Sequence, residues 1–174
     1  MAASLLIMVC GITGKSKKKE DDWPLLSQIK SSLLEKRDEL IALSREDAIA
    51  YDSVVIAAKK LRAIDEIGAR RELESSLKHA SEIPLRTASA CIAVLDYSMK
   101  VAELGIRGAW TDTAMAVLLA EAGFKGAAMN VETNLKDISD AAFVISSKAK
   151  LKEQDGQARE MIKRSLSKLS SPSI

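Results

Sequence analysis

Histidine and cysteine are almost absent from this 174-residue sequence, which contains only His79, Cys10 and Cys91 of these two types. So few ligands make a zinc site of the usual kind nearly impossible, and two cysteines cannot form the disulfide framework of a small secreted domain. A Ser-His-Asp or Cys-His enzyme would have to use His79, whose charged neighbourhood is typical of a surface residue. We therefore expect no metal cofactor and no active site built on histidine.

Aromatic residues are also scarce, at 3%, and 26 Lys plus Arg nearly balance 24 Asp plus Glu. The first scarcity excludes a base-stacking platform, and the charge balance excludes a strongly basic nucleic-acid binder. The apolar segment Met1–Cys10 has no basic region before it and is too short to span a bilayer, and no other segment is expected to be long and apolar enough. We expect a soluble, cytoplasmic protein with no nucleic-acid or membrane partner.

Proline and glycine occur only 3 and 8 times, a composition typical of helical proteins. The spacing of apolar residues predicts five or so helices, and Pro84 is expected to end or kink one of them. The predicted segments are residues 1 to about 11 or 14, about 25–61 after an Asp22-Trp23-Pro24 start, Asp65 or Gly68 to 81, 84–104, Thr111 or Asp112 to 134, and about 139–169 with a break near Gly156. Because no stretch alternates with a period of two, residues 1–174 are expected to form one all-α domain, an antiparallel up-and-down helical bundle.

Asp47 interrupts an apolar row on the helix predicted over residues 25–61. At a spacing of seven residues, the same row holds Leu33, Leu40 and Val54. A carboxyl group on a buried stripe is costly unless it is paired, and such a group is well suited to general acid or base catalysis. From the spacing alone, a catalytic carboxyl group and a buried Asp bonded to a neighbouring helix are equally good interpretations.

A row of small residues on the helix predicted to end at residue 134 becomes polar at its end. Read at steps of three and four, the row is Ala116, Ala120, Gly123, Ala127, Asn130 and Asn134. The small residues allow close approach of another helix, and the two carboxamides can both donate and accept hydrogen bonds, as a polar heterocycle requires. The alternative is that Asn134 caps the helix and Asn130 is bonded within the core.

Four short motifs occur in order along the chain. They are Asp47-Ala48-Ile49-Ala50-Tyr51, Ile83-Pro84-Leu85, Thr111-Asp112 and Asn130-Val131-Glu132-Thr133-Asn134-Leu135. They resemble the Asp-Ala-x-Ala-Phe/Tyr, Val-Pro-Leu, Ser-Asp and Asn-Val-x-x-Asn-Leu motifs of one family. That family comprises the cyclodeaminase domain of formiminotransferase-cyclodeaminase and the small methenyltetrahydrofolate cyclohydrolases.

The resemblance implies an all-α fold, a homodimer formed through its helices, and chemistry on one-carbon units carried by folate. It implies that Asp47 is the catalytic acid or base, in agreement with the row that this residue interrupts. The substrate is a tetrahydrofolate derivative, and neither reaction of the family needs a metal or redox cofactor.

The same resemblance yields candidate substrate-binding residues. Asn130 and Asn134 would hydrogen-bond the edge of the pterin, and Asp112 belongs to the Ser-Asp motif. Arg86, or the basic run over residues 15–19, would meet the glutamate tail because their charges are opposite.

Two features of the family are altered in this sequence. The N-terminal Pro-Gly-Gly-Gly-Ser loop has no counterpart, and the Gly-Lys-Lys run is replaced by Gly14-Lys15-Ser16. Because glycine-rich backbone can approach a flat ligand closely, we expect folate binding to be weakened. Three functions therefore stay open: a methenyltetrahydrofolate cyclohydrolase, a formiminotetrahydrofolate cyclodeaminase, or a catalytically degenerate member that serves as a dimeric helical or folate-binding module.

Overall fold

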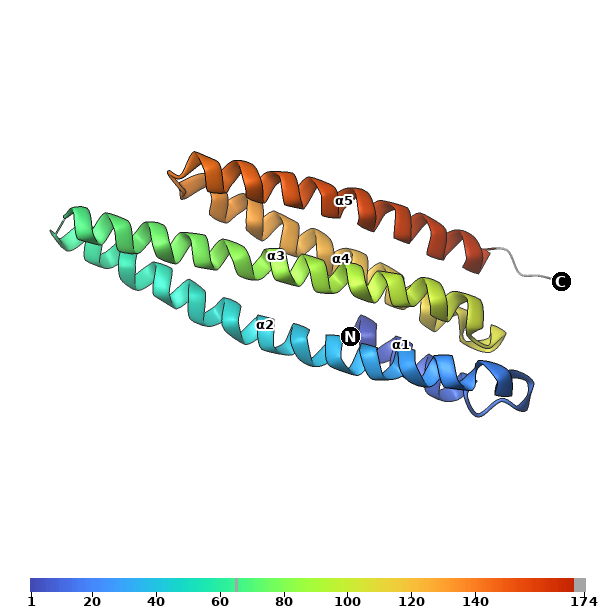
Figure 1. Ribbon diagram of the computed structural model, residues 1–174. Coiled ribbons are helices and arrows are strands. Elements are labelled where there is room, and N and C mark those ends of the chain that lie inside the picture. Colours follow the sequence, from blue (N-terminus) through green and yellow to red (C-terminus); the bar gives the residue numbers. More distant parts are fainter. Residues whose placement is uncertain (65, 171–174) are drawn as a thin grey trace.

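The computed structural model describes residues 1–64 and 66–170, which form five α-helices joined by short turns (Figure 1). The expected all-α architecture is confirmed, and the described residues contain no strand. The α-helices are α1 (Ala2–Thr13), α2 (Trp23–Ile64), α3 (Ile67–Leu104), α4 (Trp110–Asn134) and α5 (Ala141–Ser170). Three 3₁₀ helices, η1 (Lys17–Asp22), η2 (Arg107–Ala109) and η3 (Leu135–Asp137), lie in the connections.

Helix α2 packs antiparallel on α3 along most of its length. It begins at Trp23, with Pro24 in its first turn. At this position the backbone N–H that proline lacks would have no acceptor within the helix. Ion pairs between the two helices fix their register, since Glu46 pairs with Arg86 and Lys60 with Glu72. The buried side chains of α2 recur at the helical spacing that the sequence predicts and are Leu26, Ile29, Leu33, Leu43, Ala50 and Ala57.

Helix α3 is continuous through Pro84, so the prediction of two helices meeting at this proline is wrong. Asp65, one of the two predicted starts of this segment, lies outside the described residues; the helix begins at Ile67. Hydroxyl groups on either side of Pro84 bond back to carbonyls four residues earlier, from Ser81 to Leu77 and from Thr87 to Ile83. The carbonyl that loses its own donor at Pro84 has a partner on another helix, described below.

Two further helix boundaries differ from the predictions. Helix α4 begins at Trp110 with Ala109 as its N-cap, so neither Thr111 nor Asp112 caps it, although Asp112 lies in the first turn. Helix α5 runs through Gly156 without a break.

The stretch Arg107–Asp137, which contains α4, is long and apolar enough to cross a membrane by length and composition alone. The expectation that no segment has these properties is therefore wrong. In the fold this stretch is a helix of the bundle, and it packs against α1, α3 and α5.

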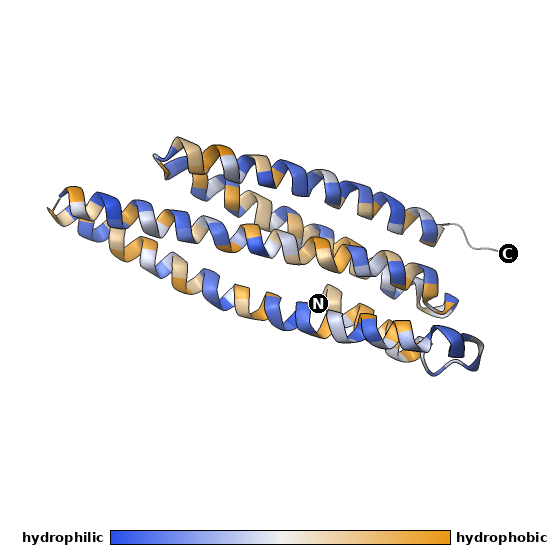
Figure 2. Cartoon of the chain, viewed as in Figure 1, coloured by the Kyte–Doolittle hydropathy of each residue, from blue (hydrophilic) through white to orange (hydrophobic). Residues whose placement is uncertain are grey.

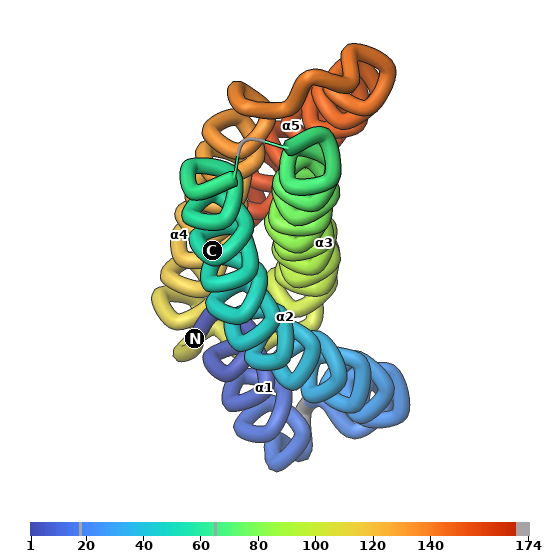
Figure 3. The backbone as a smooth tube through the Cα atoms, turned by 90° about the vertical axis from the view of Figure 1, so that its left-hand side faces the viewer, coloured from blue at the N-terminus to red at the C-terminus, as the bar shows by residue number. Residues whose placement is uncertain are grey.

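Helix α1 lies between α2 and α4 in one half of the bundle and contacts both (Figures 1 and 3). Its last residue, Thr13, is buried and accepts a hydrogen bond from the Ile106 N–H at 3.2 Å, which anchors it beside the turn between α3 and α4. Gly14 then leaves room for the Trp23 ring, because a Cβ at position 14 would lie 1.9 Å from a ring carbon. The other end of α1, at residue 1, lies about halfway along the bundle (Figure 1).

The core is continuous in the half that holds α1 and thinner in the other half. The larger cluster joins all five helices, whereas α2 and α3 alone supply a smaller cluster around Leu43, Ala50 and Ile83. Figure 2 shows that α5 is mostly hydrophilic after an apolar start.

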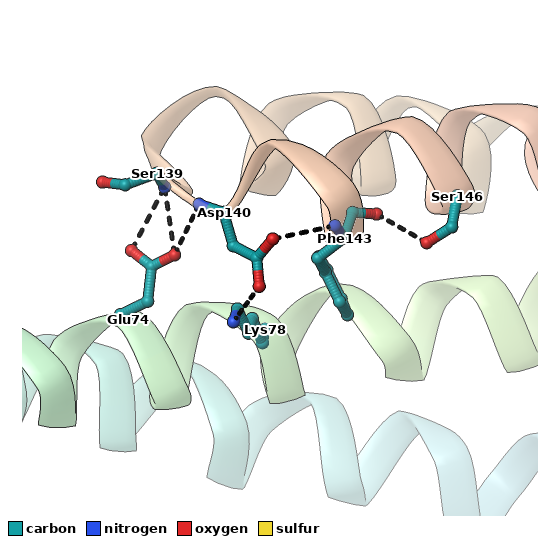
Figure 4. Close-up of polar contacts among 6 residues, drawn as sticks. All are labelled: Glu74, Lys78, Ser139, Asp140, Phe143 and Ser146. Carbon is teal, nitrogen blue, oxygen red and sulfur yellow. Dashed lines mark hydrogen bonds and ion pairs between the residues drawn. The ribbon is translucent and has the colours of Figure 1, made fainter.

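A polar clamp holds the start of α5 to α3 (Figure 4). The Glu74 carboxylate accepts hydrogen bonds from the backbone N–H groups of Ser139 at 3.1 Å and Asp140 at 2.9 Å. Asp140 in turn accepts from the Phe143 N–H at 3.1 Å and from Lys78 Nζ at 2.7 Å. The hydrogen bond between them lowers the pKa of Asp140 and raises that of Lys78. The clamp satisfies backbone donors that the first turn of a helix leaves free.

Candidate functional site

Asp47 lies on the side of α2 that packs against α3. It stands between Leu43 and Ala50, whose side chains are buried with Ile83 of α3. Asp47 itself is only partly buried, so the structure places its carboxyl group at the margin of the core rather than inside it. A carboxyl group in this position reaches solvent while its helix is held rigidly by packing.

The start of the chain lies beside α2 and near Cys91 of α3. Met1 lines a depression of about 410 Å³ together with Ser44 and Arg45 of α2. Burial raises the pKa of the Cys91 thiol on α3 to about 11, and the N-terminal ammonium group is near enough to oppose that rise. Cys91 faces Gly123 of α4, where an added Cβ would lie 3.1 Å from its sulfur. Met1, which directly precedes α1, therefore lies near α2 and α3, at the level where Cys91 contacts α4.

Helix α1 does not extend into the half of the bundle beyond residue 1. In that direction, the residues one heptad past Ser44, Cys91 and Gly123 are Tyr51 on α2, Pro84 on α3 and Asn130 on α4. Tyr51 and Asn130 are exposed, whereas Pro84 is buried. The register of α2, α3 and α4 brings Asp47, Tyr51 and Asn130 to about one level of the bundle, and we call these three residues the α2–α4 face.

Both predicted asparagines lie at the level of Asp47 along the bundle. Glu46 pairs with Arg86, and the Asn134 Nδ2 donates to the Ala80 carbonyl at 2.8 Å, so α2 and α4 meet neighbouring turns of α3. Asn130, one turn before Asn134, is exposed on the α2–α4 face. Asn134 differs from it, because its side-chain N–H is already bonded to the protein.

The two other predicted substrate-binding residues do not join this face. Arg86 shares its level but donates to Glu46 at 2.6 Å, and Glu46 lies about 140° around α2 from Tyr51 at 3.6 residues per turn. Asp112 lies near the other end of the bundle, past the end of α3 at Leu104. The α3 segment from Arg86 to Leu104 alone spans about 27 Å at the helical rise.

Tyr51 is a candidate site residue that the sequence interpretation did not select. It follows Asp47 by one helical turn, and its side chain is 68% exposed. The available signal was the i, i+4 spacing, which places Asp47 and Tyr51 on neighbouring parts of one helix surface. An exposed phenol ring beside a carboxyl group offers a flat apolar surface for a planar ligand.

The chemistry available at this face is acid–base chemistry and hydrogen bonding. Asp47 supplies a carboxyl group that can exchange a proton with water, and Asn130 supplies a donor and an acceptor. Within the described residues, no three His, Cys, Asp or Glu side chains come together in a group that could hold a metal ion.

Comparison with known proteins identifies the family of this chain. Residues 1–153 match the formiminotransferase-cyclodeaminase family. The chain is 34% identical over 162 residues to a methenyltetrahydrofolate cyclohydrolase of Methylorubrum extorquens, covering 92% of this chain and 76% of that protein.

Two further relatives agree. The crystal structure of formiminotetrahydrofolate cyclodeaminase from Thermotoga maritima superposes with a TM-score of 0.89 at 30% identity, over 98% of this chain and 82% of that one. A formimidoyltransferase-cyclodeaminase of Gallus gallus is 32% identical over 108 residues, which are 61% of this chain and 20% of that longer protein. Because the family model matches most of the chain and these relatives agree with it, the chain belongs to the formiminotransferase-cyclodeaminase family.

Proposed function

We propose that this chain hydrolyses the methenyl bridge of methenyltetrahydrofolate at the α2–α4 face, with Asp47 as the general base. The observation that carries the proposal is the position of Asp47, a partly buried carboxyl group on a packed helix, one turn from the exposed Tyr51 ring and at about the level of the exposed Asn130. The relative in Methylorubrum extorquens, which carries the name of this activity, matches nearly the whole chain.

The proposed chemistry needs one carboxyl group and one water molecule. The substrate carries a cationic amidine carbon between two nitrogen atoms. Asp47 accepts a proton from the water molecule as its oxygen attacks this carbon, and the negative carboxylate favours binding of the cation. One carbon–nitrogen bond then breaks, the departing nitrogen takes one proton, and the second proton of water is released as the formyl group forms.

The other side chains of the face bind the substrate in this proposal. The Tyr51 ring stacks on the planar heterocycle, and Asn130 hydrogen-bonds its polar edge. The reaction uses no metal or redox cofactor. Arg86 and Asp112 stay outside this proposal, because the first is paired with Glu46 and the second lies at the other end of the bundle.

Cyclodeaminase activity is the second candidate, favoured by the structural match to the Thermotoga maritima enzyme. In that reaction the formimino group closes onto the second nitrogen and ammonia leaves, so Asp47 would donate a proton instead of accepting one. Purified protein should be given methenyltetrahydrofolate and formiminotetrahydrofolate in parallel. We expect faster loss of the methenyl absorbance in the first reaction than release of ammonia in the second; the reverse ratio would assign the chain to deamination.

We also propose that the chain forms a homodimer through α1 and α4. Large apolar side chains are exposed on these two adjacent helices, and they are Met8, Ile12, Trp110, Met115, Leu118 and Met129. Only 33% of the most apolar window of the α4 stretch is buried within one chain. A second copy would cover this surface, since exposed apolar patches of this kind mark interaction sites.

A cytoplasmic location is consistent with the cysteines. Both Cys10 and Cys91 are free and buried, as is usual in reducing compartments.

A further inference from the structure

The hydrogen bond of Asn134 is explained by a proline on another helix. A residue inside an α-helix donates its N–H to the carbonyl four residues earlier, and Pro84 has no N–H to give to Ala80. The Asn134 Nδ2 lies 2.8 Å from that same carbonyl, across 54 residues of sequence. The carboxamide therefore fills the place of the missing backbone donor.

We propose that Asn134 is a positioning residue, which fixes the end of α4 against the Pro84 turn of α3 and so holds Asn130 on the α2–α4 face. For its effect on activity the inference rests on the proposed function. Asn134 is the last residue of α4 and comes directly before the 3₁₀ turn η3. Asn130 lies one turn earlier on the same helix, so a shift at residue 134 moves Asn130 relative to Asp47.

The surroundings make the bond necessary. Ala80 and Pro84 are both buried, so water has little access to the unpaired carbonyl. A buried acceptor without a donor destabilises the folded state, and Asn is among the few side chains that can supply an N–H from the end of a neighbouring helix. One observed hydrogen bond thus explains why this proline is tolerated in mid-helix and why an asparagine stands at position 134.

A double-mutant cycle tests the inference. Pro84→Ala restores a backbone N–H that can donate to Ala80, which makes the Asn134 side chain redundant. With Pro84 present, we expect Asn134→Ala to raise the unfolding equilibrium constant about tenfold; with Ala at position 84 the same substitution should change it by less than about threefold. Equal losses in both backgrounds would overturn the pairing. If the Asn134→Ala chain folds only when position 84 is alanine, the coupling is supported in its strongest form.

A second double-mutant cycle separates positioning from substrate contact. At a temperature where all variants are folded, Asn134→Ala should raise the KM for methenyltetrahydrofolate in the wild-type chain. In the Asn130→Ala chain the same substitution should change the KM by less than about twofold, because Asn134 acts through Asn130. An Asn134→Ala effect on KM of equal size in both backgrounds would make Asn134 a direct substrate ligand and contradict the inference.

Loss of the proposed function leaves a separate signature. If the wild-type chain turns over no folate, the activity proposal fails, while the stability cycle still decides whether Asn134 replaces the missing N–H of Pro84.

Discussion

Three residues that break the pattern of their helix meet at one level of the bundle. Asp47 interrupts an apolar row, Pro84 removes a donor from α3, and Asn134 ends α4 with a carboxamide. The irregularities at Pro84 and Asn134 compensate each other, because the Asn134 side chain donates to the carbonyl that Pro84 leaves without a backbone donor. Asp47 could be found from the sequence because it interrupts a row of apolar residues within a single helix. The role of Asn134 could not, because its partner is a backbone carbonyl 54 residues away.

At the residue scale, Tyr51 is expected to contribute to substrate binding and not to stability. Because its ring is 68% exposed, Tyr51→Ala should change the free energy of unfolding by no more than about 0.5 kcal/mol. The KM for methenyltetrahydrofolate should rise about tenfold, since stacking of a base on an aromatic ring contributes roughly 1–3 kcal/mol. Tyr51→Phe should keep the wild-type KM.

The control for Tyr51 is Ile49→Ala on the same helix. Ile49 is 67% exposed but lies on a different side of α2, so its loss should leave KM unchanged. Steady-state kinetics of the three variants would contradict the assigned role of Tyr51 if Tyr51→Ala behaved like Ile49→Ala.

At the scale of elements, the spacing of apolar residues predicted the helices well and their interruptions poorly. The end of α4 at Asn134 and the start of α2 near Pro24 agree with the prediction because capping and helix-breaking residues act locally. The predicted breaks at Pro84 and Gly156 are absent. Pro84 is accommodated by a donor from α4, which no local pattern reveals, and a single glycine costs a helix held by tertiary packing only about 1 kcal/mol.

The clamp between α3 and α5 should respond to pH. The hydrogen bond from Lys78 lowers the pKa of Asp140, so this pair stabilises the fold above the ordinary carboxyl value of 3.8 and ceases to do so as pH falls through the lower folded value. Lys78, whose pKa is raised, keeps its contribution below 10.5 and loses it as pH rises through the folded value. Between these limits Asp140→Asn should lower Tm slightly, and the difference from wild type should vanish in strong acid.

Thermal unfolding monitored by circular dichroism checks this dependence. Asp155→Asn is the control, because Asp155 pairs with Arg159 within α5 and joins no second helix. A pH-independent effect of Asp140→Asn, or one no larger than that of Asp155→Asn, would show that the charge pair does not hold α5 to α3.

At the scale of the whole molecule, antiparallel packing aligns distant motifs. The Asp47 motif, Pro84 and the Asn130 motif lie far apart in sequence, yet three antiparallel helices bring them to one level. Asp112 belongs to one of these motifs but lies in the first turn of α4, at the opposite end of the bundle from Asn134. The sequence motifs identify which residues differ from a plain bundle, while the register between helices decides which of them meet.

The apolar surface of α1 and α4 leads to a prediction about assembly. Met115→Glu combined with Leu118→Glu should convert a dimer into a folded monomer, because two charges would have to be buried without partners. Sedimentation velocity at micromolar concentration measures this, with Ile145→Glu on α5 as the control that stays dimeric. A wild-type chain that sediments as a monomer would contradict the proposed dimer.

The most direct test of the central claim is the turnover of methenyltetrahydrofolate by Asp47→Asn. This substitution keeps the size of the side chain and removes its capacity to accept a proton, so kcat should fall at least about 100-fold while the protein stays folded. Glu46→Gln, the neighbouring exposed carboxyl group paired with Arg86, should keep wild-type turnover within about threefold. If Asp47→Asn instead retains the wild-type rate, Asp47 is not the general base and the assignment of the α2–α4 face as the active site is wrong.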